Sequence, residues 1–486
     1  MLFNSISFLI YFPVVVLAYF AMPRNAKNIW LLLASYYFYM SWNVQYGFLI
    51  LLSTVITYVC GLMVEKQKST LYRKLTFALS LASNFGILFF FKYFEWILDN
   101  VNRVLGSEYG LSFTILLPVG ISFYTFQAVG YTFDVYRGKL KAEKNFITYA
   151  LFVSFFPQLV AGPIERSTNL IGQLKSPTSF KAENVTKGLQ VMLWGYVEKM
   201  VIADNLAILV DQVYGNYESY GGCVLALTAV LFAIQIYCDF GGYSHIAIGA
   251  AKVLNITLME NFRQPFFACG IREHWQRWHI SLSGWFRDYL YIPMGGSRCS
   301  KWRKYVNVMV TFLASGMWHG ASWHYIAWGG LHGGYRVIGE ALHPMKQRVW
   351  QLLHIDTGHI LYKAMQRVVT FLLVVIAFIV FRATSIGEAL RIMGIIVSLF
   401  DGVQLVNGTL LTLGLNLAQV LLTLLALALL LMVDIVHEKG GHFSAWIGRK
   451  PIVVRYGIYY GLILLVLISV LQTFGQSAAS FLYFQF

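Results

Sequence analysis

The chain has few charged residues for its length. Of its 486 residues, 12% are charged and 58% are hydrophobic, and the mean hydropathy is +0.61. Soluble domains carry about a quarter charged residues, so this composition excludes a water-soluble globule. About 20 apolar residues cross a hydrocarbon core of roughly 30 Å. The length is therefore enough for many membrane helices joined by short loops.

Several common site motifs are also missing. The five cysteines are scattered without a C-x-x-C pair, so neither a disulfide framework nor a zinc site is indicated. There is no G-x-S-x-G elbow and no P-loop. The histidine pairs His274/His279 and His319/His324 are five residues apart, unlike the four-residue spacing of helical zinc ligands. We predict no metal and no bound cofactor.

The first 23 residues lack the basic start and small-residue cleavage site of a secretory signal, which predicts a retained first span. The net charge of +15 comes from Lys and Arg in short loops between apolar runs rather than from a solvated basic domain. The positive-inside rule explains this better than nucleic-acid binding. Basic turns at residues 24–27, 66–74 and 137–144 alternate with basic-poor turns, which predicts an extracytoplasmic N-terminus.

The apolar runs predict an all-α polytopic membrane protein, a single membrane-embedded domain over residues 1–486 with about eleven to thirteen membrane helices. Two segments differ from simple membrane-spanning helices. Residues 146–166 have basic residues at both ends, which favours a re-entrant segment lining a cavity. Residues 263–304 hold eight Lys or Arg among Trp and Tyr residues, so we predict an interfacial segment on the cytoplasmic face.

His319 lies in the motif GMWHGASW, between the end of one apolar run and the start of the next. Ionisable residues at membrane depth are costly and are functional candidates by default. A histidine can also accept and return a proton near neutral pH. Ser315 and Gly316 lie one helical turn before it and should leave room for a substrate. The alternative is a buried histidine hydrogen-bonded to a carbonyl at a helix end.

The motif WQRWHISLS contains His279. In a continuous helix, His279 would share an inward face with Trp275, Leu282 and Phe286. Arg277 and Arg287 would project elsewhere, toward lipid phosphates or toward an anionic substrate such as a nucleotide-bearing thioester. Lipid contact is the favoured interpretation. Asp288 is interpreted as the ion-pair partner of Arg287.

A further ionisable residue, Asp239, lies in a long apolar run and requires a partner or a function. We favour a structural hydrogen-bonding role for it.

The two histidine motifs resemble those of the membrane-bound O-acyltransferase family, and within it the bacterial alginate O-acetyltransferase branch. The most specific match is HWQRWHISLSGWFRDYLYIPMGGSR at 274–298, followed by GMWHGASW at 316–323. Similar features run from MLFNS at the start, through FFPQLVAGPIER, CDFGGYS and ENFRQPF, to the YFQF ending. One departure is His245, which stands where the family usually has an acid.

The resemblance implies a helical shell around a central tunnel reachable from both membrane faces, with residues 263–304 near the cytoplasmic mouth. It also implies that His319 is the catalytic histidine and that His279 is the second histidine of the same site. The candidates for substrate binding within or beside these motifs are Trp278, Arg277, Arg287, Asp288, Ser315 and Asn261.

The implied activity is transfer of an acyl group, expected to be acetyl, from a cytoplasmic thioester such as acetyl-coenzyme A to hydroxyls of an exported polysaccharide. The expected location is the bacterial inner membrane. The expected partners are the lipid bilayer, the polysaccharide acceptor and an extracytoplasmic transferase that relays the acyl group, with no nucleic acid. Transfer of D-alanine, peptidoglycan O-acetylation and lipid acylation are alternatives. A transporter should show paired interrupted helices in two halves, and no such repeat is visible.

Overall fold

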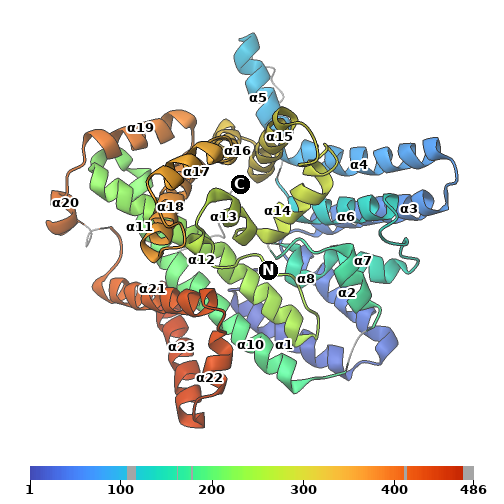
Figure 1. The fold of residues 1–486 in the computed structure, drawn as a ribbon. Helices are drawn as coiled ribbons and strands as arrows, with labels where there is room; N and C mark the ends of the chain where they lie inside the picture. Colours follow the sequence, from blue (N-terminus) through green and yellow to red (C-terminus); the bar gives the residue numbers. More distant parts are fainter. Residues whose placement is uncertain (107–115, 161, 177–178, 410–412, 474–486) are drawn as a thin grey trace. The chain divides into compact units, whose positions relative to one another are not determined.

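The computed structural model describes residues 1–106, 116–160, 162–176, 179–409 and 413–473, so the YFQF ending lies outside the described residues. Within these ranges the regular structure is helical and contains no strand (Figure 1). The predicted all-α class is therefore confirmed.

Six described helices are long and apolar enough to cross a membrane. Helices of 23 residues are about 34 Å long at 1.5 Å per residue, which exceeds the hydrocarbon thickness. The chain is thus a multi-pass membrane protein, whereas the total of eleven to thirteen spans and the central tunnel stay predictions. The six are α3 (Val44–Lys66), α4 (Thr70–Lys92), α12 (Gly222–Val253), α18 (Ile360–Arg382), α21 (Leu417–Glu438) and α23 (Ile452–Thr473).

The chain forms two compact units. Unit 1 comprises residues 1–192 and 243–260, and unit 2 comprises residues 193–242 and 261–486. Besides α3 and α4, unit 1 contains α1 (Ile6–Ala21), α2 (Arg24–Met40), α5 (Phe94–Leu105), α6 (Ile121–Tyr136), α7 (Phe146–Ser154), α8 (Phe156–Leu159) and α9 (Ser167–Leu174). Helices α10 (Ala182–Tyr196) and α12 run across the boundary between the units.

Unit 1 packs α6 against α3 and α4, and nearly every residue of α6 is buried. The segment 146–166 contains the short helices α7 and α8, which are also buried. Side chains satisfy the backbone where these helices break: Gln127 and Gln158 both donate to the Phe152 carbonyl, and the Ser35 hydroxyl accepts from the Phe156 N–H. Such satisfaction is what irregular backbone at membrane depth requires. The re-entrant path itself stays a prediction.

Unit 2 is built from the following further elements: η1 (Val197–Ala203), α11 (Asp204–Gly215), η2 (Tyr217–Ser219), η3 (Pro265–Phe267), α13 (Ile271–Arg277), α14 (Ile280–Phe286), η4 (Arg287–Tyr291), α15 (Lys301–His319), α16 (Trp323–Ala341), α17 (His343–Leu352), α19 (Ile386–Ser398), α20 (Val403–Val406) and α22 (Phe443–Gly448). Its most extensive helix pair is α15 against α16, and α18 packs on α16. Helices α16 and α18 thus pack around the end of α15, where His319 lies.

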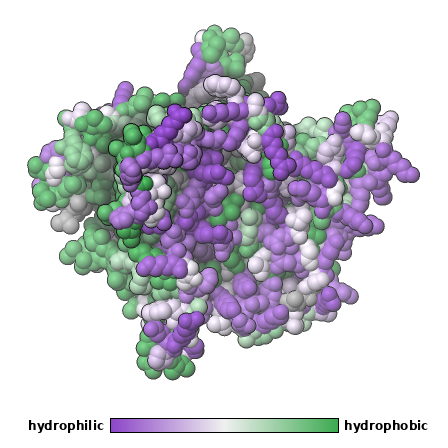
Figure 2. Space-filling view, viewed as in Figure 1, coloured by the Kyte–Doolittle hydropathy of each residue, from purple (hydrophilic) through white to green (hydrophobic). Residues whose placement is uncertain are grey.

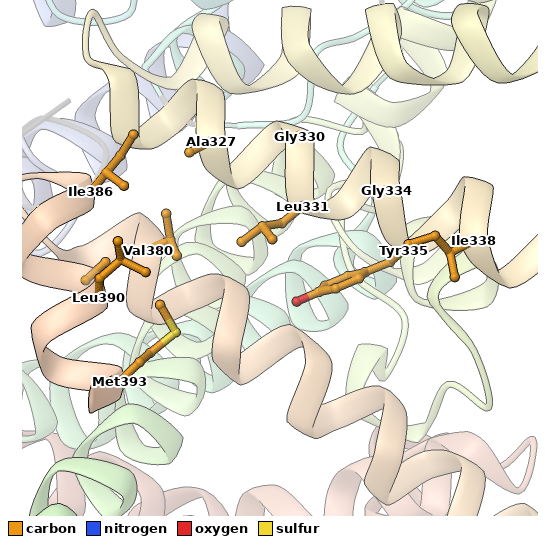
Figure 3. Close-up of a pocket in the computed structure, with 11 residues that line it drawn as sticks. Ala327, Gly330, Leu331, Gly334, Tyr335, Ile338, Val380, Ile386, Leu390 and Met393 are labelled. Carbon is orange, nitrogen blue, oxygen red and sulfur yellow. The ribbon is translucent and has the colours of Figure 1, made fainter. Parts of the chain in front are cut away.

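The surface of unit 2 is strongly apolar over α19 and α20, seen as green at the left of Figure 2. Val397, Phe400 and Val406 there are each more than two-thirds exposed. A contiguous apolar surface of this kind suits contact with lipid. Next to it an open groove of about 420 Å³ runs between α16, α18 and α19, and its lining is almost entirely apolar (Figure 3).

Candidate active site

His319 is the last residue of α15, and the chain leaves the helix through an extended Gly320. Its side chain is only 5% exposed. Aromatic rings meet it edge-on from three elements: Trp318 of α15 and Trp328 of α16 at 5.0 Å between centroids, and Phe381 of α18 at 5.4 Å. The imidazole is therefore held in a narrow aromatic environment within unit 2.

Glycines bring α15 and α16 into backbone contact directly before His319. A Cβ atom on Gly316 would lie 2.2 Å from the Tyr325 carbonyl oxygen, and one on Gly329 would lie 2.3 Å from the Phe312 carbonyl oxygen. The space beside Gly316 is thus filled by α16, and the expectation that Gly316 leaves room for a substrate is wrong. Its small size instead allows close helix packing, as small residues do in membrane helix pairs. Ser315 is buried, at 5% exposure.

The inward face expected for His279 required a continuous helix, and the chain is not one continuous helix at this residue. Helix α13 ends at Arg277, α14 begins at Ile280, and His279 between them has φ +42° and ψ +55°, in the left-handed region. The Trp278 N–H still closes α13 on the His274 carbonyl at 2.8 Å, whereas the Ile280 N–H donates to the Asn261 carbonyl at 2.9 Å. Since the chain turns here, His279 does not share a helical face with the residues three and four positions away.

Asn261 fixes the start of α14. Its side-chain oxygen accepts from the Ser281 hydroxyl at 2.6 Å, and its backbone carbonyl accepts from Ile280. The side chain is 1% exposed. Left-handed conformations of non-glycine residues cost energy and persist where surrounding contacts hold them. Asn261 supplies such contacts for the turn that contains His279.

The structure places the two predicted histidines against one tryptophan in unit 2. The ring of Trp318 lies 6.0 Å from that of His279 and 5.0 Å from that of His319, between centroids. His279 also meets Phe240 of α12 edge-on at 4.6 Å. It is 1% exposed, and this burial lowers the pKa of His279 to about 3. Its imidazole is therefore neutral at physiological pH.

The other motif residues have separate environments. Trp278 is buried in an aromatic cluster with Phe262 at 5.0 Å and Phe378 at 5.5 Å. Arg277 forms ion pairs with Glu273 at 2.6 Å and with Glu438 of α21. Protein carboxylates thus hold its guanidinium, which corrects the interpretation as a lipid contact.

The neighbouring pair at the start of η4 is more open. Arg287 pairs with Asp288 at 2.8 Å, as the sequence suggested, and its side chain is 66% exposed. A headgroup contact of Arg287 stays a prediction.

Sequence reasoning missed a buried charge cluster beside the site. The Lys199 ammonium lies 2.7 Å from the Asp204 carboxylate and 2.5 Å from the Asp239 carboxylate, with side-chain exposures of 3%, 16% and 4%. Lys199 belongs to the π-helical turn η1. Asp239 directly precedes Phe240, the residue that contacts His279. The hydrogen bond expected for Asp239 is confirmed, whereas its structural role stays a prediction. The signal for its partner was a lysine within an apolar run.

Comparison with known proteins identifies the class of protein to which this site belongs. The model of the membrane-bound O-acyltransferase family matches residues 138–381, a range that includes both histidines. The chain is 35% identical to a protein of Pseudomonas putida described as a probable alginate O-acetylase, over the whole of both chains. The chain belongs to the membrane-bound O-acyltransferase family.

Two further relatives show the range of acyl acceptors in related proteins. A peptidoglycan O-acetyltransferase of Helicobacter pylori is 35% identical, with 83% of this chain and 81% of the relative covered. A teichoic acid D-alanyltransferase of Streptococcus thermophilus is 30% identical, but only 47% of this chain is covered. The chain is thus a membrane acyltransferase whose similarity to O-acetyltransferases extends much further than its similarity to D-alanyltransferases.

Proposed function

We propose that this protein moves an acetyl group from a cytoplasmic thioester, acetyl-coenzyme A, toward hydroxyls of an exported cell-surface polysaccharide. The observation that carries the proposal is the placement of His279 and His319 against Trp318, buried among aromatic rings. The full-length similarity to an alginate O-acetylase supports the polysaccharide acceptor. Peptidoglycan is the second candidate, supported by the Helicobacter pylori relative.

In this mechanism His319 is the general base. Its imidazole accepts the proton of the acceptor hydroxyl while the hydroxyl oxygen attacks the thioester carbonyl carbon. The C–S bond then breaks, and the imidazolium returns the proton to the leaving thiolate, so one ester and one thiol form and no proton is consumed. The neutral imidazole of His279 orients the thioester or stabilises the developing charge. A narrow, water-poor site also raises the effective concentration of the reactants and protects the thioester from hydrolysis.

The proposal places the protein in the bacterial inner membrane with its N-terminus outside. The donor enters from the cytoplasmic side near residues 263–304, and the acceptor, or a partner transferase that relays the acetyl group to it, is reached from the opposite side. Six candidate spans and the basic aromatic composition of residues 263–304 support this arrangement.

The test is transfer from labelled acetyl-coenzyme A by membranes containing wild type or His319→Ala. Loss of a general base should lower the rate by about 10²- to 10⁴-fold. His343→Ala is the matched control, since His343 is an exposed histidine at the start of α17, and it should keep the wild-type rate. A correctly inserted and folded His319→Ala variant with undiminished transfer would discard the proposed base.

A further inference from the structure

Helix α16, which packs against the end of α15 where His319 lies, carries two buried side chains with ring nitrogens. Trp328 and His332 are four residues apart and so lie on one helix face, with ring centroids 4.9 Å apart. Trp328 is 2% exposed and His332 is 1% exposed. Trp328 meets the His319 ring edge-on at 5.0 Å. The pair therefore extends the site from His319 by one helical turn along α16.

A neighbouring indole sets the tautomer of His332. The Trp275 Nε1–H of α13 donates to His332 Nδ1 at 3.3 Å. Because Nδ1 is the acceptor in this bond, the proton of the neutral imidazole is on Nε2, which is then a donor. His274 stacks nearly parallel to His332, with an interplanar angle of 4° and centroids 6.5 Å apart. The ring of His332, on α16, is thereby held against α13.

The ring N–H groups of Trp328 and His332 both lack a hydrogen-bond partner in the part of the chain that the structure describes. His332 Nε2 and Trp328 Nε1 are buried and have no hydrogen-bond acceptor there. Buried polar groups in proteins are almost always hydrogen-bonded, so two adjacent unpaired donors beside a catalytic candidate indicate a place for acceptor oxygens of a ligand. The donors are neutral, so they suit carbonyl oxygens rather than requiring a charged group.

We infer that Trp328 and His332 form a binding subsite for the acyl donor. In it, Trp328 Nε1–H and His332 Nε2–H donate to carbonyl oxygens of the thioester and of the amide-containing arm behind it. The inference rests on the proposed function, because the donor is a coenzyme A thioester there. It favours the acyl donor over the acceptor because His332 is bonded to Trp275, within the residues 263–304 that we place at the cytoplasmic side.

Two substitutions at one position separate ligand binding from structural support. The amide of His332→Asn can take the place of Nδ1 and still accept from Trp275, but it offers no donor at Nε2. The amide of His332→Gln reaches the Nε2 position and keeps the donor, but gives up the bond to Trp275. Trp328→Phe removes only the N–H and keeps an aromatic ring against His319. Leu331→Val, which faces the apolar groove in Figure 3, is the control on the same helix.

The measurements are transfer rates at varied acetyl-coenzyme A and equilibrium binding of coenzyme A to the purified full chain. We expect His332→Asn and Trp328→Phe each to raise the KM for acetyl-coenzyme A and the Kd for coenzyme A about tenfold, with little change in kcat. His332→Gln should recover most of that loss, and Leu331→Val should match wild type.

The opposite order, with His332→Gln impaired and less heat-stable while His332→Asn binds normally, would show that the bond to Trp275 is all that matters. Unchanged KM and Kd in both variants would show that a buried water satisfies these donors. Either outcome overturns the subsite and leaves the proposed function standing. If wild type neither transfers the acetyl group nor binds coenzyme A, the proposed function fails, and the subsite fails with it.

Discussion

Adding one methyl group to Gly316 should displace the helix that ends in His319. The new Cβ would lie 2.2 Å from the Tyr325 carbonyl oxygen, and ordinary contacts begin near 3.4 Å. The neighbour is rigid helix backbone, so α15 and α16 must separate by about 1 Å to relieve the clash. A shift of this size at a catalytic group can cost about 10²-fold in rate, and overpacking of this kind costs about 1–3 kcal/mol of stability.

The matched control is Gly334→Ala, also in this helix pair. A Cβ there meets no atom within 4 Å, so the alanine should raise helix stability by about 0.5–1 kcal/mol. The two variants should therefore move the melting temperature in opposite directions, measured by differential scanning fluorimetry in detergent. Only Gly316→Ala should lose acetyl transfer. If both variants melted and transferred alike, close packing of α15 on α16 would not be what holds His319.

Three further outcomes follow from other parts of unit 2. Asn261→Ala and Ser281→Ala should each destabilise the protein by about 1–3 kcal/mol and lower transfer, because both remove the hydrogen bond between the two side chains. Asn261→Ala also removes the acceptor of the Ser281 N–H, so the double variant should be no worse than Asn261→Ala alone. Additive losses would contradict this. Burial lowers the pKa of His274 to about 4 and that of His279 to about 3. Below about pH 6.5 these histidines therefore bind protons in the unfolded chain but stay neutral in the folded chain. The free energy of unfolding should fall as the pH drops from about 6.5 toward 4, by up to about 1.4 kcal/mol per pH unit for each histidine. A melting temperature that is equal at pH 7 and pH 5 would refute the shifts. Ser297→Cys, in a chain with its native cysteines replaced, should resist an impermeant thiol reagent added outside intact cells, and ready labelling would reverse the proposed orientation.

The sequence was enough to predict the class of fold and the two histidines that the structure places near each other. Hydropathy depends on composition along the chain, so the membrane helices could be recognised from local runs. His319 was found because an ionisable residue between two apolar runs is conspicuous in any sequence. The functional roles of both histidines stay predictions.

What the sequence did not predict depends on residues that are distant in the chain. The break at His279 is fixed by Asn261, 18 positions earlier, and Arg277 pairs with Glu438, which is 161 positions later. Both contacts join residues that are further apart in the sequence than the few helical turns over which a hydrophobic periodicity is recognised. The expectation for Gly316 was wrong for the same reason. A glycine in a sequence is compatible with open space or with a close neighbour, and only the position of α16 in the fold decides between them.

The bridge from Lys199 to Asp204 and Asp239 also has a consequence for how the protein is made. Left in lipid without Lys199, the helix that carries Asp239 would expose a carboxylate to hydrocarbon at considerable cost, whereas Lys199 already has Asp204 within its own segment. The segment with Lys199 and Asp204 is joined to α12 by the short connection after α11, so the two can leave the insertion machinery as one hairpin in which Lys199 is already paired with Asp239. Biogenesis of this region should accordingly depend on pairing before release, and η1 to α12 should behave as a single step of assembly.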